Sequence, residues 1–429
     1  MSKRYQVSEE WLKRALKSIP LGTQTFSKSR TQYPFGVSPY YAQKAKGCRL
    51  WDVDGNEYID CISSLCSVTL GYNDPDVTQA VREQLEDGVI FSLPHKLEVE
   101  VSEEIIKMVP SAEMVRFGKN GSDATSGAIR LARAYTGRDR VAVCGYHGWQ
   151  DWYIGSTARN KGVPKSTQEL THSFVYNQIE TLQQVLKQHP GEFAAVIMEA
   201  MNISEPQEGF LQEVQALAKQ HGALFILDET ITGFRYANGG AQELFGLQPD
   251  LATFGKGLAN GYPVSAVAGR ADIMKLMEEI FFSFTFGGET LSLAASLATM
   301  KKLQKEPVVE TIRQRGSELQ EGLKSLIASH GVEAFCSVAG HPSWSFFVIK
   351  DTEKYSLWQI KTLFLQEMFK QGILTFGTHN MNYAHQKADV QRILQAYDTV
   401  LPLLGETVKN NTLEQKLECA PLEPLFKIR

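Results

Sequence analysis

The chain has 429 residues, of which 43% are hydrophobic and 21% are charged, and its formal net charge is −4. This length suggests about two or three domains of roughly 150 residues each. The composition is that of an ordinary globular protein, and the slightly acidic balance does not favour nucleic acid as a partner. The sequence has no apolar run of about 18 residues, so we expect no membrane-spanning helix and no membrane partner.

The N-terminal segment lacks an apolar stretch of signal-peptide length. Its apolar residues Trp11, Leu12, Ala15, Leu16 and Ile19 recur at helical spacing, which predicts an amphipathic helix. The six cysteines are dispersed and form no CxxC pair, a pattern typical of reduced thiols in a cytoplasmic protein. We expect no metal site.

Short apolar runs alternate with helical patterns through the middle of the chain. The runs cover residues 114–119, 140–146, 194–200, 223–229 and 250–256. Because they lack polar alternation, they predict strands that are buried on both faces. The alternation of strands and helices predicts an α/β fold with a mostly parallel sheet flanked by helices. Ligands bind at the carboxyl ends of the strands in such sheets, so we expect the residues that end these runs to converge on one site.

The segments on either side of this region have different patterns. Asp54 and Gly55 form a turn dipeptide between two strand-like runs, which predicts a hairpin. After about residue 300, helical patterns at 311–331 and 389–408 flank a strand-like run at 343–350. We therefore expect a large domain of residues 61–309 and a smaller α+β domain.

The smaller domain is expected to combine an N-terminal segment, residues 1–60, with a C-terminal part, residues 310–429.

Two residues at the ends of apolar runs are the first candidates for chemistry. Lys256 is flanked by glycines, which would let a carbonyl-bearing cofactor approach closely, although a lysine in a glycine-rich loop is usually solvated. Asp228 ends a buried run, where a carboxylate is costly unless it is paired. It could pair with a protonated ring nitrogen of a cofactor or merely cap a strand-to-loop junction.

A phosphate site is predicted where Asn120, Gly121 and Ser122 follow an apolar run and open a helical pattern. The N–H groups at a helix start and the Ser122 hydroxyl can bind an anion, and the alternative is a plain N-cap. Thr285 lies in a glycine-containing loop that enters another helix. It is either a second phosphate contact or a simple turn hydroxyl.

Aromatic residues follow the run that ends at residue 146. Tyr146 could stack on a flat cofactor ring, and His147 could assist, with a packed or hydrogen-bonded histidine as the favoured alternative. Trp149 and Trp152 are candidates for the substrate entrance, with core packing as an equal alternative.

Seven motifs, in this order, resemble those of the class III aminotransferases of pyridoxal-phosphate (PLP) fold type I. They are LWDVDGNEYID, LGYNDPDV, NGSDATSGAIRLARAYTGRD, GYHG, LDETITGFR, FGKGLANGYPVSAVAG and TFGGETLSLAA. The resemblance covers nearly the whole chain and is greatest to the aminomutases of glutamate-1-semialdehyde and their aminotransferase relatives.

The resemblance implies a role for each cofactor residue. Lys256 would hold PLP as a Schiff base, and Asp228 would pair with the pyridine nitrogen. Residues 120–122 would bind the phosphate, and Tyr146 would stack on the ring. Thr230 stands where the family usually has a valine, and its methyl group could pack on the other ring face.

The resemblance also bears on partners and substrate. Thr285 would reach the phosphate of the neighbouring subunit, which implies a homodimer with shared active sites. Lys28 stands where the aminomutases have an arginine for the substrate carboxylate, and a lysine lacks the planar fork of arginine. Leu65 replaces a tryptophan and Gly377 replaces a gating glutamate. Lys28, Leu65 and Trp149 are therefore the candidate substrate-binding residues.

These matches predict a PLP-dependent aminotransferase that moves an amino group from a donor, expected to be glutamate, to an aldehyde or ketone. The acceptor could be carbohydrate-like or a specialised metabolite. Two alternatives stay open. One is a glutamate-1-semialdehyde 2,1-aminomutase, and the other is a non-catalytic regulator or binding protein on the same scaffold, against which the intact Lys256 and Asp228 argue.

Overall fold

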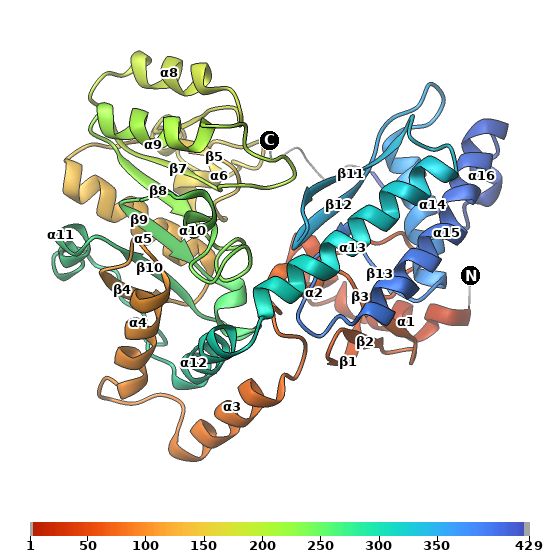
Figure 1. Cartoon of the computed structure of the whole chain (residues 1–429), viewed down its shortest axis with the longest axis horizontal. Coiled ribbons are helices and arrows are strands. Elements are labelled where there is room, and N and C mark those ends of the chain that lie inside the picture. Colours follow the sequence, from red (N-terminus) through yellow and green to blue (C-terminus); the bar gives the residue numbers. More distant parts are fainter. Residues whose placement is uncertain (1–2, 424–429) are drawn as a thin grey trace. The chain divides into compact units, whose positions relative to one another are not determined.

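The computed structural model describes residues 3–423, which form two compact units (Figure 1). Within these residues, unit 1 consists of residues 3–65, 70–74 and 310–423. Unit 2 consists of residues 66–69 and 75–309. The division into domains at residues 1–60, 61–309 and 310–429 stays a prediction.

Unit 2 is built around a seven-stranded sheet. From one edge to the other, its strands are β4 (Met114–Gly118), β10 (Ser265–Gly269), β9 (Leu251–Phe254), β8 (Leu224–Asp228), β7 (Phe193–Met198), β5 (Arg140–Cys144) and β6 (Thr171–Ser173). The strands from β9 to β6 pair in parallel, whereas β10 pairs antiparallel with both β4 and β9. All residues of β7, β8 and β9 are buried, which explains their unbroken apolar sequences.

The α/β fold predicted from the sequence is confirmed, including all five strands read from apolar runs. Strand β10 was not among those runs. Its sequence SAVAG is dominated by small residues with weak strand propensity. Its pairing with β4 on one side and β9 on the other stabilises it instead. The sheet is therefore mixed, with β10 running against the other strands.

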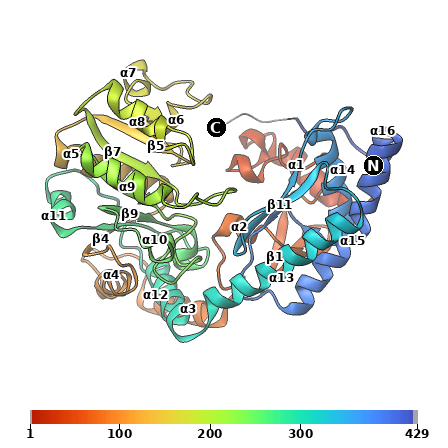
Figure 2. The same cartoon turned by 45° about the horizontal axis from the view of Figure 1, so that its top comes forward.

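Helices surround this sheet. In chain order the helices of unit 2 are α3 (Pro75–Asp87), α4 (Lys96–Met108), α5 (Gly121–Thr136), α6 (Asp151–Ile154), α7 (Lys165–Gln168), α8 (Ile179–Gln188), α9 (Phe210–Gln220), α10 (Ala241–Phe245), η4 (Lys256–Ala259), α11 (Ala271–Met274), η5 (Lys275–Glu278) and α12 (Thr290–Lys305). Helix α5 packs against β7, β9 and β10. Figure 2 shows α3 beside α12, and α12 also contacts η4, the short helix that begins at Lys256.

Unit 1 contains two smaller sheets. One has the order β1 (Ala42–Lys46), β2 (Arg49–Asp52), β3 (Glu57–Asp60) and β13 (Ile373–Leu374), and the other has the order β11 (Cys336–His341), β12 (Trp344–Ile349) and β14 (Thr378–His379). Its helices are η1 (Lys3–Tyr5), α1 (Gln6–Ala15), η2 (Pro20–Gly22), η3 (Phe26–Lys28), α2 (Ser63–Cys66), α13 (Val308–Ser329), α14 (Leu357–Lys370), α15 (Lys387–Asn410) and α16 (Leu413–Lys416). The predicted hairpin is confirmed, since β2 pairs antiparallel with β3 and Gly55 has a φ of 86°.

The amphipathic helix predicted near the N-terminus is confirmed as α1, although it does not include all the apolar residues of the predicted stripe. Helix α1 ends at Ala15, and Trp11 and Leu16 are exposed, so only Leu12 and Ala15 of the expected stripe are buried on it. Turns follow α1 from Leu16 to Ser18, and Ile19, the residue before Pro20, is extended, which stops any continuation of the helix.

The six cysteines are all free, and five of them are buried. Among the described residues, no helix combines the length and the apolar character needed to span a membrane.

Candidate functional site

A cavity of about 470 Å³ lies at the carboxyl ends of the strands of unit 2. We call it the cofactor cavity. Its walls come from the segments that follow β4, β5, β8 and β9, together with the residue that follows β7. The sequence-predicted residues that line it are Asn120, Gly121, Ser122, Tyr146, His147, Trp149, Asp228, Thr230 and Lys256. The strand ends therefore converge, as the alternation of strands and helices predicted.

Lys256 is the first residue of η4 and has a φ of 42°, which is unusual for a residue with a side chain. The glycines beside it allow the backbone to pack closely: a Cβ on Gly257 would lie 2.5 Å from Thr69 Oγ1. Burial lowers the pKa of Lys256, although the charges of Glu199 and Asp228 act in the opposite direction. A lysine amine with a lowered pKa is more often neutral, and the neutral amine is the nucleophile and the base.

Asp228 ends β8 and is buried. Its Oδ1 accepts hydrogen bonds from the Thr230 N–H and the Thr253 hydroxyl, both at 3.0 Å, and its Oδ2 lies 2.8 Å from His147 Nδ1. Burial alone would raise the pKa of Asp228, but the hydrogen bond and charge of His147 and the hydrogen bond from the Thr230 backbone N–H hold it below its ordinary value. Asp228 is therefore a buried carboxylate that stays ionised at neutral pH.

His147 is the hydrogen-bonded residue that the sequence favoured over a catalytic one. Its Nε2 lies 3.2 Å from the Cys144 carbonyl, and its own carbonyl accepts the Thr125 hydroxyl at 2.8 Å. These contacts fix the imidazole ring against Asp228. The sequence could not pair the two residues, because they stand 81 positions apart.

The start of α5 has the geometry of an anion site. Asn120 is its N-cap and forms a capping box with Asp123: the Asn120 side chain accepts the Asp123 N–H at 3.2 Å, and Asp123 accepts the Asn120 N–H at 3.0 Å. The cap orders the first turn, where backbone N–H groups have no partners within the helix. These groups and the positive end of the helix dipole favour a phosphate.

Glycines bring the loops around this turn close together. A Cβ on Gly148 would lie 2.2 Å from Ser122 Oγ, and a Cβ on Gly121 would lie 2.9 Å from Thr230 Cγ2. The Ser122 hydroxyl accepts the Trp149 N–H at 3.2 Å. Gly148 was missed from the sequence, although its position directly after residues 146 and 147 was a usable signal.

The aromatic residues divide between the cavity and the core. Tyr146 and Trp149 line the cavity, and both are exposed. Trp152 is buried in the hydrophobic core, and its Nε1 donates to Ser126 Oγ at 3.0 Å. Of the two alternatives for Trp152, core packing is therefore confirmed, and a position at the substrate entrance is wrong.

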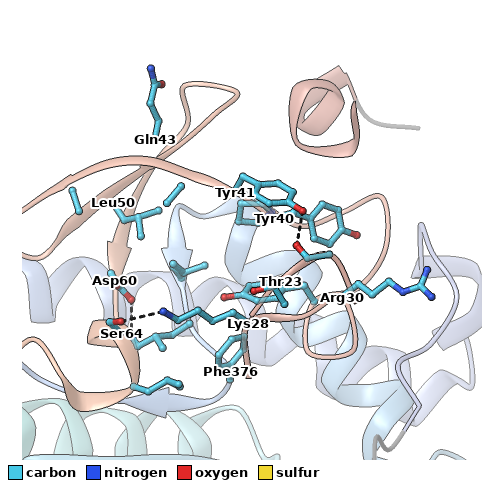
Figure 3. A pocket seen from close by; sticks show the side chains of 18 of the residues that line it. Thr23, Lys28, Arg30, Tyr40, Tyr41, Gln43, Leu50, Asp60, Ser64 and Phe376 are labelled. Carbon is cyan, nitrogen blue, oxygen red and sulfur yellow. Dashed lines mark hydrogen bonds between the residues drawn. The ribbon is translucent and has the colours of Figure 1, made fainter. Parts of the chain in front are cut away.

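Three predicted residues lie outside the cofactor cavity. Thr285 is exposed in the turn before α12, and its reach to a neighbouring subunit stays a prediction. Lys28 and Leu65 line a separate cavity of about 430 Å³ in unit 1 (Figure 3). Figure 3 shows the Lys28 amine directed towards Ser64 and Asp60, and its Nζ donates to Ser64 Oγ at 3.4 Å.

The comparisons with known proteins agree with one another. Residues 33–388 match the family model described as aminotransferase class-III. The glutamate-1-semialdehyde 2,1-aminomutase of Desulforamulus reducens is 35% identical over 92% of this chain and 98% of that relative. The enzyme of the same name from Syntrophobacter fumaroxidans is 34% identical over 88% of this chain and 93% of that relative.

Solved structures show the same fold. The FumI protein of Sphingopyxis sp. MTA144, determined with PLP, is 28% identical with a TM-score of 0.87, covering 95% of this chain and 98% of that one. A β-phenylalanine aminotransferase from Variovorax paradoxus is 26% identical with a TM-score of 0.83, covering 95% of both chains.

The cofactor cavity fits PLP on its own chemistry. It offers a helix N-terminus for a phosphate, an ionised buried carboxylate for a ring nitrogen and an amine with a lowered pKa for a carbonyl. The Thr230 hydroxyl in its wall is buried and has no hydrogen-bond partner among the described residues, which suits a polar ligand. The chain belongs to the class III aminotransferases and is a PLP-dependent transaminase.

Proposed function

We propose that this enzyme moves an amino group from an amino-acid donor, with glutamate expected, to an aldehyde or ketone acceptor. The observation that supports the proposal most is the meeting of Lys256, Asp228 and residues 120–122 in one cavity. Each of the three supplies a different kind of contact, and together they match the carbonyl, the ring nitrogen and the phosphate of the cofactor.

Lys256 is the proposed catalytic lysine. Its Nζ would hold the cofactor covalently until the donor amine displaces it. The freed amine would then accept the proton from the substrate Cα and donate it to the C4′ atom of the cofactor, acting as general base and then general acid. The lowered pKa of Lys256 supports this role, because the amine must be neutral to accept a proton at neutral pH.

The other residues bind and orient. PLP, when bound, supplies an electron sink for the bond that breaks at the substrate Cα. Asp228 would keep the ring nitrogen protonated, while residues 120–122 would bind the phosphate. Tyr146 and Thr230 would cover the two faces of the ring and exclude water.

We also propose a homodimer in which Thr285 of each subunit contacts the phosphate held by its partner. The exposed position of Thr285 leaves it available for such a contact. The apolar side chains Phe281 and Phe286 on the same loop are also exposed, as expected for a surface that another subunit covers. A cytoplasmic location stays a prediction.

A second candidate is the intramolecular aminomutase. The names of the curated relatives favour it, at 34% and 35% identity. Against it stand Lys28, Leu65 and Gly377, which replace the arginine, tryptophan and glutamate expected of an aminomutase. An aminomutase must retain its intermediate through both half-reactions, so the loss of a carboxylate grip and a gate favours release.

One assay separates the two candidates. The holoenzyme is given glutamate-1-semialdehyde alone and, separately, glutamate with a panel of aldehydes and ketones. We expect turnover only when donor and acceptor are both present. Efficient formation of 5-aminolevulinate from the semialdehyde alone would replace the proposed function with the aminomutase.

A further inference from the structure

Lys119 connects the starts of two helices of unit 2. It stands directly before the N-cap of α5, and its backbone N–H donates to Asp123 Oδ2 at 2.9 Å. The same oxygen accepts the Asn120 N–H at 3.0 Å. The capping box that orders the proposed phosphate-binding turn, residues 120–122, therefore also orders the backbone of Lys119.

The side chain of Lys119 extends from this turn to the start of α12. Its Nζ donates to Glu289 Oε2 and to the Pro263 carbonyl, both at 3.0 Å. The side chains of Lys119 and Glu289 are only 21% and 14% exposed, so water screens this ion pair less than it screens a pair on an open surface. We therefore expect the pair to hold its geometry more firmly than a fully exposed pair would.

Glu289 is an unusual N-cap for α12. Shorter side chains are preferred at this position, yet the Glu289 carboxylate accepts the N–H groups of Leu291 and Ser292, at 2.8 and 3.3 Å. Burial alone would raise the pKa of Glu289, but the Ser292 hydroxyl and the Lys119 ammonium hold it below its ordinary value. One charged carboxylate thus caps α12 and pairs with Lys119.

The loop that precedes Glu289, residues 281–288, carries Thr285. At one end of the loop, the ring of Phe282 is buried in the hydrophobic core. At the other end, two backbone hydrogen bonds, of 3.1 and 3.2 Å, fold residues 284–289 into a turn. Because this turn is short and hydrogen-bonded, the position of Glu289 determines the position of Thr285.

We propose that Lys119 is a positioning residue: its ion pair with Glu289 holds loop 281–288 where Thr285 can contact the phosphate bound by the partner subunit. This inference rests on the proposed homodimer. Lys119 would thereby link the phosphate-binding turn of its own subunit to the cofactor of the other, and its loss would weaken cofactor binding in the other subunit.

The first test is a double-mutant cycle on the affinity of the apoenzyme for PLP, measured by equilibrium dialysis. Lys119→Met should weaken binding about tenfold, as expected for Thr285→Ala, because both variants lose the same hydrogen bond to a charged phosphate. The double variant should bind no more weakly than Thr285→Ala alone, since the two changes act on one contact. Lys119→Arg keeps the charge and should restore most of the affinity.

A matched control breaks another ion pair of α12. Lys302 lies in the last turn of this helix, and its Nζ is 2.7 Å from Asp76 Oδ2, with its side chain 9% exposed. Lys302→Met should leave the affinity for PLP unchanged. Thermal unfolding of both methionine variants shows that they are folded, and light scattering gives their oligomeric state.

Hybrid dimers show which subunit is affected. One subunit carries Lys256→Ala, so only the other, which we call the intact subunit, can hold PLP covalently. The covalently held PLP is measured by borohydride reduction at a series of PLP concentrations. Lys119→Met in the Lys256→Ala subunit should shift the half-saturating concentration about tenfold, the loss of one hydrogen bond to a charged phosphate, whereas Lys119→Met in the intact subunit should leave it unchanged.

The other outcomes overturn the inference in distinguishable ways. If Lys119→Met acts only on the cofactor of its own subunit, Lys119 contacts that cofactor directly and positions nothing for the partner. If Lys119→Met leaves PLP binding unchanged while Thr285→Ala weakens it, the inference is wrong and the proposed shared site stands. If Thr285→Ala has no effect and light scattering finds an active monomer, the shared site and the inference are both wrong.

Discussion

The cofactor cavity of unit 2 and the unit 1 cavity that Lys28 lines, which we call the Lys28 cavity, each contain a lysine and a buried aspartate. The surroundings of these charged groups nevertheless differ between the two cavities. In unit 2, burial lowers the pKa of Lys256, and His147 helps to hold the pKa of Asp228 below its ordinary value. In unit 1, Lys28 is exposed, and burial raises the pKa of Asp60. The residue types are the same, so their surroundings decide what they can do.

The partners of the two aspartates explain the difference. Asp60 accepts the Tyr72 hydroxyl at 2.6 Å and two backbone N–H groups at 2.7 and 3.1 Å. These hydrogen-bond donors are neutral, and together with the charge of the exposed Lys28 they only partly offset the cost of burying an ionised carboxylate. Asp228 has an imidazole at 2.8 Å in addition to its neutral donors, and this added contact reverses the direction of the shift. Burial of an aspartate is therefore not enough to predict a functional site, because its hydrogen-bond partners decide the direction in which its pKa shifts.

The largest expected effect separates the two lysines. Lys256→Ala should lower the rate of transamination by about 1000-fold or more, because both the covalent link and the general base are lost. Borohydride reduction of the unaltered holoenzyme, followed by peptide mapping, should find the cofactor on Lys256. Lys119 lines the same cavity but pairs with Glu289 at 3.0 Å, so it serves as an internal control. Label on Lys119 or Lys28 would refute the assignment.

The next effect separates the two aspartates. Asp228→Asn should reduce the transamination rate by about 100-fold while the phosphate contacts still retain PLP, since a charged hydrogen bond in a dry site is worth a few kcal/mol. Asp60→Asn is the matched variant in unit 1, and it should leave the cofactor spectrum unchanged. Rates and bound cofactor are measured together for both variants. Near-normal turnover of Asp228→Asn would show that Asp228 does not act on the cofactor ring.

A smaller effect concerns a residue outside both cavities. Thr285→Ala should weaken PLP retention about tenfold, the loss expected for one hydrogen bond to a charged phosphate. Ser283→Ala, on the same exposed loop, is the control and should retain PLP normally. Equilibrium dialysis measures the affinity, and light scattering gives the oligomeric state. A stable and active monomer would contradict the shared site.

The cofactor cavity could be predicted largely from the sequence, whereas the Lys28 cavity could not. Residues 120–122, Asp228 and Lys256 each end an apolar run, and the topology of an α/β sheet brings such ends together. No comparable rule relates Lys28 to Asp60 and Phe376, which come from three distant segments and meet only through packing. The topology of the sheet also brings His147 near Asp228, but the hydrogen bond between them depends on side-chain packing that the sequence does not show.

Local patterns failed where tertiary structure or a neighbouring residue overrode them. Trp11 and Leu16 fit the helical spacing of the apolar residues, but both side chains are exposed: Trp11 lies within α1, and Leu16 follows its last residue. Strand β10 was missed because its small residues carry little strand propensity of their own, and its pairing partners lie far away in the chain. Glu199 lies in another apolar run, and its hydrogen bond with the Tyr146 N–H at 3.0 Å required the structure.

The subtlest expected effect is a difference in sign between the two aspartates in the pH dependence of folding. The pKa of Asp228 is lowered in the folded state, so its contribution to stability is present above the unfolded pKa and is lost as pH falls through the folded one. The pKa of Asp60 is raised, so between the unfolded and folded pKa values the folded state binds more protons, and stability falls as pH rises.

Asp60→Asn should therefore remove a decrease in stability with rising pH, whereas Asp228→Asn should remove an increase. An asparagine at position 60 can keep both backbone hydrogen bonds through its Oδ1, because both N–H groups donate to that atom in the aspartate. Its amide N–H can in turn donate to the Tyr72 hydroxyl. The free energy of unfolding of each holoenzyme is measured in urea at several pH values between 3 and 7. If both variants change the slope in the same direction, the proposed contrast between an imidazole partner and neutral partners is wrong.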